Sequence, residues 1–312
     1  MDTTAVLLSQ PSVIGLADVD LNPMGEEDAL IDVHWTGIST GTERLMFEGT
    51  MPDFPGMGYP LVPGYEAVGE VIAAGPRSNR CVGETVFVPG SKGFRSVRSL
   101  FGAAASHLVV TGARAIPAPA SLGDKAVLLA LAATAHHALV RAGTEPGLIV
   151  GHGTLGRLIA RLALALGKTC PTVWETNAAR RSGAFDYPVL DSGEDAERQF
   201  PCIIDASGAA NVLDTLIARL APRGELVLAG FYDERMSFNF PAAFMREARI
   251  TIAAEFQADD VEAVLRLLEE ERFSLDGLIT HREDANDAAQ AYGQAFGDPQ
   301  CLKMVLDWRK LS

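Results

Sequence analysis

The sequence predicts an α/β protein in which a β-rich domain precedes a doubly wound domain built on a parallel sheet. Up to about Pro119, short apolar segments are separated by Gly and Pro turns, a pattern typical of β strands. From Leu148 onward, short apolar runs alternate with segments of helical spacing, as in βαβ units. We therefore expect a domain border near residue 120.

Five segments of the first part are expected to be strands because each is a short, largely apolar run flanked by turn residues. They are AVLLS, ALIDVHWTG, YEAVGEVIAAG, ETVFVPG and SHLVV. Together they predict a small, mostly β domain.

The segment 121–141 is apolar nearly all round, so we expect a buried helix between the domains, with Ser121 or Asp124 capping its start. Beyond it, strands are expected at 148–151, 172–175, 202–208, 225–230 and 249–255. Helices are expected at 155–166, 211–220, 261–270 and 284–296. Gly167 is placed to end the first of these helices.

Composition excludes several classes of protein. The chain has 312 residues and a net charge of −14, which disfavours nucleic acid because phosphate binding needs a basic face. The four cysteines are widely spaced, which argues against a disulfide framework and a four-thiolate zinc site. No apolar run is long enough to span a membrane, and no secretion signal is recognisable, so we expect a cytoplasmic protein without a transmembrane segment.

A glycine loop follows the first strand of the second part. Residues Gly151, His152, Gly153, Thr154, Leu155 and Gly156 form the G-x-G-x-x-G string. In such loops the first glycine permits a tight turn, the second lets a pyrophosphate approach, and the third lets helix and strand pack closely. An apolar strand before it and an amphipathic helix after it support a dinucleotide site.

Glu175 ends the next expected strand, 24 residues after Gly151. A carboxylate at this place can accept hydrogen bonds from ribose hydroxyls and would repel a 2′-phosphate. The sequence therefore favours NAD over NADP, although Arg180 and Arg181 lie close by in the chain.

Several strings resemble the medium-chain dehydrogenase/reductase superfamily. They are GISTGTE at 37–43, PLVPGYEAVGEV at 60–71, TAHHAL at 134–139, the glycine loop, DASG at 205–208 and LITH at 278–281. The resemblance implies a GroES-like catalytic domain formed by 1–120 and 257–312, and a Rossmann domain at 121–256. It also implies that Thr134, Ser207 and Gly208 help to hold the cofactor.

A narrower resemblance, carried by WTGISTGTE, FPGMGYPLVPGYEAVGE, LAGFY, FMREARI and FGDPQCLKMVLDW, is to a pigment-biosynthesis branch of the superfamily. That branch oxidises the 3-(1-hydroxyethyl) group of a bacteriochlorophyllide to 3-acetyl with NAD. The resemblance implies a chlorophyll-type tetrapyrrole as the substrate and is compatible with a homodimer.

The chain departs from the zinc members of the superfamily at the metal ligands. Ser39, Tyr65 and Ala130 stand where those members carry Cys, His and Cys, and the lobe of four cysteines that holds structural zinc is missing. Hydroxyl, phenol and methyl groups do not make a transition-metal site. We therefore expect hydride transfer without zinc.

Without a metal, protein groups must stabilise the alkoxide and remove its proton. Tyr65 is the candidate hydrogen-bond partner of the substrate oxygen, and Glu66, Ser39, Thr40 and Thr42 are candidates for relaying its proton. The alternative is that Tyr65 and Glu66 only pack within the β domain.

Two further features stay open at the level of sequence. The Met- and Phe-rich segment 45–59 either forms the wall of a pigment pocket or covers the core of its own domain. His136 or His137 faces the nicotinamide, or both are structural. The alternative functions are a zinc-free NAD(P)H enone or quinone reductase and a non-catalytic nucleotide-binding protein.

Overall fold

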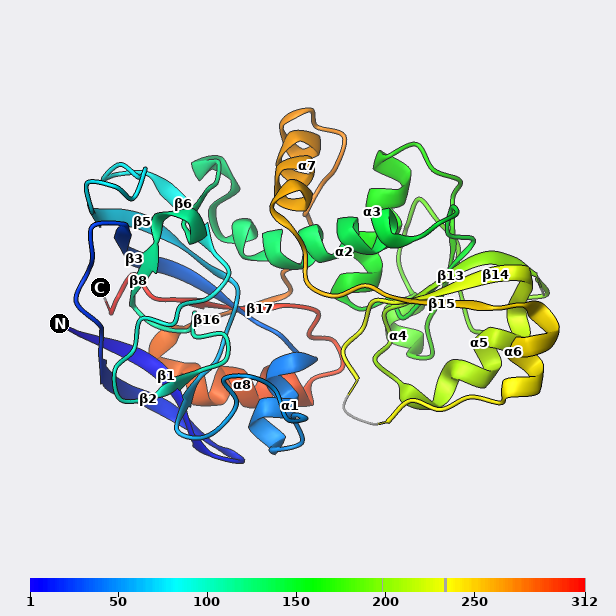
Figure 1. Ribbon diagram of the computed structural model, residues 1–312, viewed down its shortest axis with the longest axis horizontal. Coiled ribbons are helices and arrows are strands. Elements are labelled where there is room, and N and C mark those ends of the chain that lie inside the picture. The colour runs from blue at the N-terminus through cyan, green and yellow to red at the C-terminus, as the bar shows by residue number, and fades with distance from the viewer. Residues whose placement is uncertain (198, 233–234, 312) are drawn as a thin grey trace. The chain divides into compact units, whose positions relative to one another are not determined.

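A computed structural model describes residues 1–197, 199–232 and 235–311, and its contacts divide the chain into two compact units (Figure 1). The first unit comprises Met1–Ala130 and Asp276–Ser312, and the second comprises Leu131–Leu275. Residues 121–130 thus cluster with the first unit and 257–275 with the second, which differs from the borders that we expected from the sequence. Each unit has its own hydrophobic core.

The first unit is built on two sheets. A seven-stranded sheet has the order β16-β17-β3-β5-β6-β9, with β8 also paired to β3, and a four-stranded sheet has the order β2-β1-β4-β7. The strands are β1 (Asp2–Gln10), β2 (Val13–Asp20), β3 (Asp28–Ile38), β4 (Leu61–Val62), β5 (Ala67–Ala74), β6 (Thr85–Val88), β7 (Arg98–Ser99), β8 (His107–Thr111), β9 (Ile116–Pro117), β16 (His281–Asp284) and β17 (Met304–Asp307).

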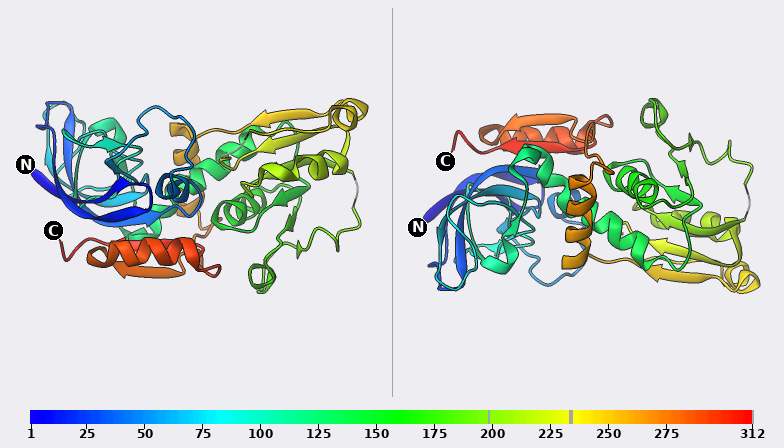
Figure 2. Two further views of the ribbon diagram at one scale, coloured as in Figure 1. Left: turned by 90° about the horizontal axis from the view of Figure 1, so that it is seen from below. Right: turned by 90° about the horizontal axis from the view of Figure 1, so that it is seen from above.

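Two short α-helices complete this unit: α1 (Thr42–Glu48) follows β3, and α8 (Ala288–Gly297) lies beside β16 and β17 (Figure 2). Three 3-10 segments, η1 (Gly112–Arg114), η2 (Ala120–Leu128) and η4 (Ala285–Asp287), follow β8, β9 and β16. Alternation along β3 buries Ala29, Ile31 and Val33, as a strand with one face on a core requires. The predicted β-rich first domain is confirmed.

The second unit is a parallel six-stranded sheet in the order β12-β11-β10-β13-β14-β15. Numbered within the unit, this is the 3-2-1-4-5-6 order of a doubly wound dinucleotide-binding fold. The strands are β10 (Leu148–Val150), β11 (Thr172–Trp174), β12 (Val189–Leu190), β13 (Phe200–Asp205), β14 (Leu220–Leu228) and β15 (Arg249–Ile252). The predicted Rossmann architecture is confirmed.

The helical segments of the second unit are α2 (Leu129–Arg141), which begins two residues before it, α3 (Thr154–Ala165), α4 (Ala178–Arg181), η3 (Ala210–Val212), α5 (Leu213–Arg219), α6 (Phe240–Arg246) and α7 (Ala258–Glu269). Along α3, Leu158, Ile159 and Leu162 are buried on one face, and Gly167 follows the helix with φ +71°. α5 and α6 both pack on β14 (Figure 1).

The segment 121–141 is not one helix. Its first part is the 3-10 segment η2, interrupted at Gly123 with φ 53°, and the α-helix begins only at Leu129. The expected caps are also absent, because no side chain caps η2 and Asp124 instead pairs with Arg282. Apolar character all round predicted the burial correctly but could not reveal the glycine kink.

None of the helices in the described part of the chain is long and apolar enough to cross a membrane. None of the four cysteines, all of which lie in the described part of the chain, forms a disulfide: Cys81 and Cys170 are exposed, and Cys202 and Cys301 are buried.

Candidate functional site

Ser39 and Thr40 lie in the loop between β3 and α1 of the first unit. Ser39 is buried, and Thr40 is partly exposed. Just upstream, Gly37 has no room for a side chain, because a Cβ there would lie 2.0 Å from Oε2 of Glu66. The absence of a side chain at Gly37 therefore lets β3 pass directly against the carboxylate of Glu66, the residue before β5.

Tyr65 and Ser39 form a hydroxyl pair. The Tyr65 phenol donates a hydrogen bond of 2.7 Å to Ser39 Oγ, and its ring packs edge-on against Phe101 with centroids 5.2 Å apart. Burial, reinforced by the negative charge of Glu66, raises the pKa of Tyr65 well above its usual range. The phenol consequently stays protonated and is available as a donor.

Glu66 is committed to an ion pair. Lys303 Nζ donates to both carboxylate oxygens, at 2.8 and 2.7 Å, and to the Ile38 carbonyl at 3.2 Å. Both side chains are almost completely buried. Burial raises the pKa of Glu66, while the charge and hydrogen bonds of Lys303 oppose that rise. This geometry favours an anchoring role for Glu66 over proton relay.

Sequence reasoning missed a second buried carboxylate, Glu43, in the first turn of α1. Its Oε1 accepts a hydrogen bond of 2.9 Å from the Ser39 N–H, and its Oε2 accepts one of 2.6 Å from the Tyr292 phenol. The side chain is fully buried. Its place within the GISTGTE string was visible, but Tyr292 and Lys303 lie more than 230 residues away along the chain, and no local pattern connects them to it.

Part of the Met- and Phe-rich segment belongs to a small hydrophobic core, whereas Phe54 is 38% exposed. Met46 and Met51 are buried with Leu8, Leu61 and Leu100 in one cluster. This packing supports the interpretation that the segment covers its own domain.

Within the described residues, no group of three or more His, Cys, Asp or Glu side chains is placed to hold a metal ion. Ser39 and Tyr65 are hydrogen-bonded to each other, and the buried Ala130 offers only a methyl group. Hydride transfer without zinc stays a prediction.

The glycine loop of the second unit has the shape that a dinucleotide needs. Gly151 has φ +94°, and a Cβ on Gly156 would lie 1.8 Å from the Gly151 carbonyl oxygen, so neither position admits a side chain. A Cβ on Gly153 would meet nothing closer than the Arg180 guanidinium at 4.0 Å. The middle glycine therefore leaves open the space that a pyrophosphate would need.

Glu175 follows β11 and is tied to this loop. Its Oε2 accepts from the His152 N–H at 2.9 Å, and its Oε1 accepts from the Asn177 N–H at 2.8 Å. A carboxylate offers about four lone-pair sites, so each oxygen retains capacity for a ribose hydroxyl. The neighbouring Arg181 is held by the Glu175 and Thr176 carbonyls and by Asp191 at 3.2 Å.

The His152 side chain is buried and supports the glycine loop through hydrogen bonds. Its ring is buried between the Tyr187 phenol and the Arg180 carbonyl, at 3.0 and 2.8 Å. Burial and the charge of Arg157 lower the pKa of His152 to about 4, so the ring is neutral near pH 7. Its backbone N–H donates to Glu175 in this arrangement.

The other predicted cofactor residues lie in the same unit. Thr154 and Leu155 begin α3, and Ser207 approaches the loop, since its Cα lies 3.0 Å from a Cβ built on Gly151. Gly208 has φ +72°. Thr134 is partly buried on α2, and its place beside a nicotinamide stays a prediction.

Both histidines of α2 bind one carboxylate of α7. The Nδ1 atoms of His136 and His137 lie 2.7 and 2.9 Å from the two oxygens of Asp260, which also completes a capping box with Gln257. These contacts favour the structural interpretation of both histidines.

Comparison with known proteins agrees with this architecture. The family model of the alcohol dehydrogenase GroES-like domain matches residues 25–120. A solved alcohol dehydrogenase from Escherichia coli CFT073, complexed with the cofactor NADH, has the same fold with a TM-score of 0.82, at 21% identity over 98% of this chain and 99% of that one.

Two curated relatives are much more similar in sequence. The 2-desacetyl-2-hydroxyethyl bacteriochlorophyllide A dehydrogenases of Rhodobacter capsulatus and Cereibacter sphaeroides are each 52% identical to this chain, over 99% of it and 99% of their own length. Identity at this level along the whole chain leaves no domain unmatched. The chain therefore belongs to the family of the 2-desacetyl-2-hydroxyethyl bacteriochlorophyllide A dehydrogenases, within the medium-chain dehydrogenase/reductase superfamily.

Proposed function

We propose that this protein oxidises the 3-(1-hydroxyethyl) group of a bacteriochlorophyllide to 3-acetyl with NAD, a step of bacteriochlorophyll a biosynthesis, and that it does so without zinc. The names of the two relatives that share 52% of its residues support the substrate. The observation that carries the chemistry is the hydrogen bond between Tyr65 and Ser39. The family resemblance implies that these two residues replace metal ligands of the zinc-dependent members.

In the proposed reaction the carbinol carbon loses a hydride and its oxygen loses a proton, which together leave the ketone. NAD supplies the hydride acceptor. Because Tyr65 donates to Ser39 and stays protonated, the Ser39 hydroxyl is polarised and can donate to the developing alkoxide. Thr40, partly exposed in the same loop, offers a hydroxyl route for the proton toward solvent. Lys303 neutralises the charge of Glu66, and this ion pair fixes the residue that follows Tyr65 in the chain.

Glu175 supports NAD as the dinucleotide. Its carboxylate is fixed by two backbone N–H groups beside the open position at Gly153, so it is preorganised to accept ribose hydroxyls. A 2′-phosphate at the same place would meet a negative charge.

The direct test is an assay of the purified protein with 3-hydroxyethyl bacteriochlorophyllide a and either NAD or NADP, in the presence and absence of a chelator. We expect NAD-dependent formation of the 3-acetyl product that persists in chelator, together with far less than one zinc per chain by elemental analysis. Loss of activity on chelation would overturn the metal-free mechanism. A lack of tetrapyrrole oxidation would overturn the substrate.

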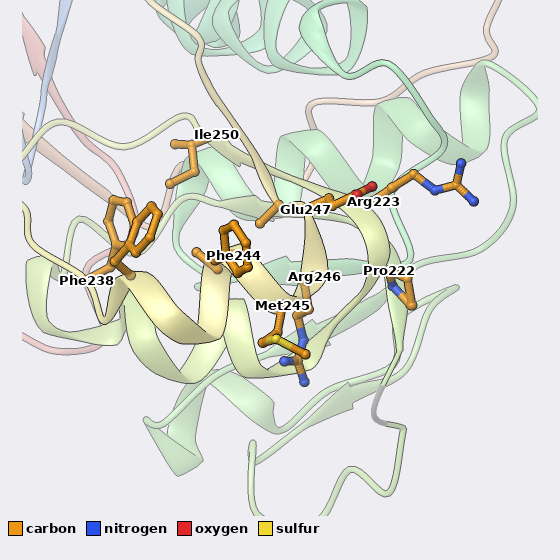
Figure 3. A pocket seen from close by; sticks show the side chains of 11 residues that line it. Pro222, Arg223, Phe238, Phe244, Met245, Arg246, Glu247 and Ile250 are labelled. Carbon is orange, nitrogen blue, oxygen red and sulfur yellow. The ribbon is translucent and has the colours of Figure 1, made fainter.

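We further propose that the protein is a homodimer joined through β15. This strand lies at the edge of the six-stranded sheet, and in the described part of the chain it pairs only with β14. Ile252 is 71% exposed, and Phe240 and Phe244 on the adjacent α6 are each 66% exposed. Phe238, Phe244 and Ile250, which come from the segment before α6, from α6 and from β15, line one pocket (Figure 3). A second copy turned by a two-fold axis would present the same edge, so both strands could pair and both apolar patches would be covered.

The cytoplasmic location and the lack of a nucleic-acid partner stay predictions. Fractionation of cells that express the tagged protein tests the location, and a shift assay with duplex DNA at stated salt tests the nucleic acid.

A further inference from the structure

The mechanism proposed above makes no use of Glu43, although this carboxylate lies directly behind the hydroxyl pair. Burying an ionisable group without a counter-ion is strongly unfavourable unless hydrogen bonds compensate. Glu43 is fully buried, and the groups that reach its two oxygens, the Ser39 N–H and the Tyr292 O–H, are both donors. An arrangement of donors alone fits an ionised carboxylate, which can only accept.

Charged and titratable groups face Glu43 from several elements. Tyr65 and Glu66 immediately precede β5, Lys303 immediately precedes β17, and Tyr292 comes from α8. Burial raises the pKa of Glu43 to about 7, against the lowering effect of its hydrogen bonds from Tyr292 and Ser39. Its charge therefore changes in the range where cells work.

Ser39 links this carboxylate to the proposed chemistry. Its N–H is held by Glu43 at 2.9 Å, while its Oγ accepts from Tyr65 at 2.7 Å. Thr42, next to Glu43 in the first turn of α1, acts on the same Tyr65 phenol and opposes the rise of its pKa. A change at Glu43 is thus transmitted to the hydroxyl pair through one residue.

We propose that Glu43 is a positioning residue whose ionised carboxylate fixes Ser39, and through Ser39 the Tyr65 phenol, in the geometry that receives the substrate oxygen. The inference rests on the proposed function for its effect on turnover. It does not rest on it for the coupling between Glu43 and Tyr65, which can be measured without substrate.

The kinetic experiment compares wild type with Glu43→Gln and Tyr292→Phe across pH. Wild-type kcat should fall on the acid side with a midpoint near the pKa of Glu43, about 7. Glu43→Gln should lower kcat about 10-fold or more at high pH, leave both KM values within about 2-fold, and abolish the acid limb. Tyr292→Phe should move the limb to higher pH, because it removes a hydrogen bond that lowers the pKa of Glu43.

The matched control is Glu225→Gln. Glu225 is another buried glutamate that accepts from a backbone N–H, that of Gly143 at 2.7 Å, and from a hydroxyl, that of Thr251, but it lies in the other unit. Its replacement should leave the acid limb in place. An unchanged kcat and pH profile in folded Glu43→Gln would overturn the proposal.

The substrate-free experiment follows the ¹³Cζ resonance of Tyr65, assigned with Tyr65→Phe, through a pH titration by NMR. In wild type it should shift with a midpoint near 7, and in Glu43→Gln it should not shift. If the Tyr65 titration depends on Glu43 but the wild type is inactive, only the proposed function is overturned. A Tyr65 resonance indifferent to pH in wild type would overturn the role of Glu43, whatever the activity.

Discussion

Removal of the Tyr65 hydroxyl gives the most direct test of the proposed chemistry at a single residue. Tyr65→Phe deletes the hydroxyl that donates to Ser39 and keeps the ring against Phe101. Without the phenol, the Ser39 hydroxyl is no longer polarised toward the developing oxyanion, and losing such stabilisation costs about 100-fold or more in kcat. NAD affinity should stay nearly constant. Because one hydrogen bond joins the two residues, the losses in Tyr65→Phe and Ser39→Ala should not add in the double variant. Wild-type turnover in Tyr65→Phe would return this side chain to a packing role.

Glu175 tests the choice of dinucleotide. Hydrogen bonds to a charged group contribute about 1.5–3 kcal/mol, so Glu175→Ser should weaken NAD binding about 10- to 100-fold and relieve the repulsion of NADP. Calorimetry with both dinucleotides at fixed salt measures the change, and Glu194→Ser, an exposed carboxylate of the same unit, is the control. If wild type binds NAD and NADP equally, Glu175 does not discriminate between them.

Glu43 gives stability a pH dependence of definite sign. Its pKa is about 7 in the folded protein and near the ordinary 4.5 in the unfolded chain, so the folded state binds the proton more tightly. Its stabilising contribution is complete below about pH 4.5 and is lost as pH rises through 7. Relative to wild type, Glu43→Gln should therefore gain in free energy of unfolding between pH 5 and pH 8, measured by urea denaturation. A difference that stays constant with pH would contradict the shifted pKa.

Whether a site residue could be predicted from the sequence depended on how far along the chain its contacting residues lie. The glycine loop and Glu175 were identifiable because their function follows from spacing within a single βαβ unit. Tyr65 and Ser39 were selected only because they replace metal ligands, and their hydrogen bond supports that pairing without testing it. Glu43 and Lys303 escaped notice, since their partners are brought to them by folding and not by any local period.

At the scale of elements, Asp260 joins two helices. It accepts from His136 and His137 on α2 and from the Gln257 N–H at the start of α7. Asp260→Asn should therefore lower the free energy of unfolding by about 1–3 kcal/mol, the range for a buried hydrogen-bonded group deprived of its partners. Asp259→Asn, one residue earlier and exposed, is the matched control. Equal stability of the two variants in urea would show that the shared carboxylate does not hold α2 to α7.

The borders of two strands differ from those that hydrophobic periodicity predicted. β14 begins at Leu220, directly after α5 ends at Arg219, whereas we expected a helix through 220 and a strand only from 225. Asp284, where we expected a helix to begin, is instead the last residue of β16, which pairs in parallel with β17. Such a pairing partner is set by tertiary structure, and a short mixed segment fits helix and strand equally well.

At the scale of the whole molecule, the paired-edge hypothesis predicts a particle of twice the chain mass in light scattering. Ile252→Lys places a charge on the exposed face of β15 and should yield monomers, because a buried unpaired charge at the two-fold axis would be costly. Val82→Lys, at a residue 66% exposed in the other unit, should leave the dimer intact. A monomeric wild type at assay concentration would exclude this assembly.

The close passage of Gly37 over Glu66 constrains how this sequence can change over generations. A methyl group at position 37 would displace the carboxylate that Lys303 neutralises, stranding a buried cation. Replacing Lys303 first leaves the buried anion unpaired, and neutralising Glu66 first leaves the buried cation unpaired, so no route begins with a tolerated single step. The three positions should consequently be inherited as a block, and descendants that lose one member should have lost the other two as well. An ancestor reconstructed with alanine at 37 would then be expected to carry uncharged residues at both 66 and 303.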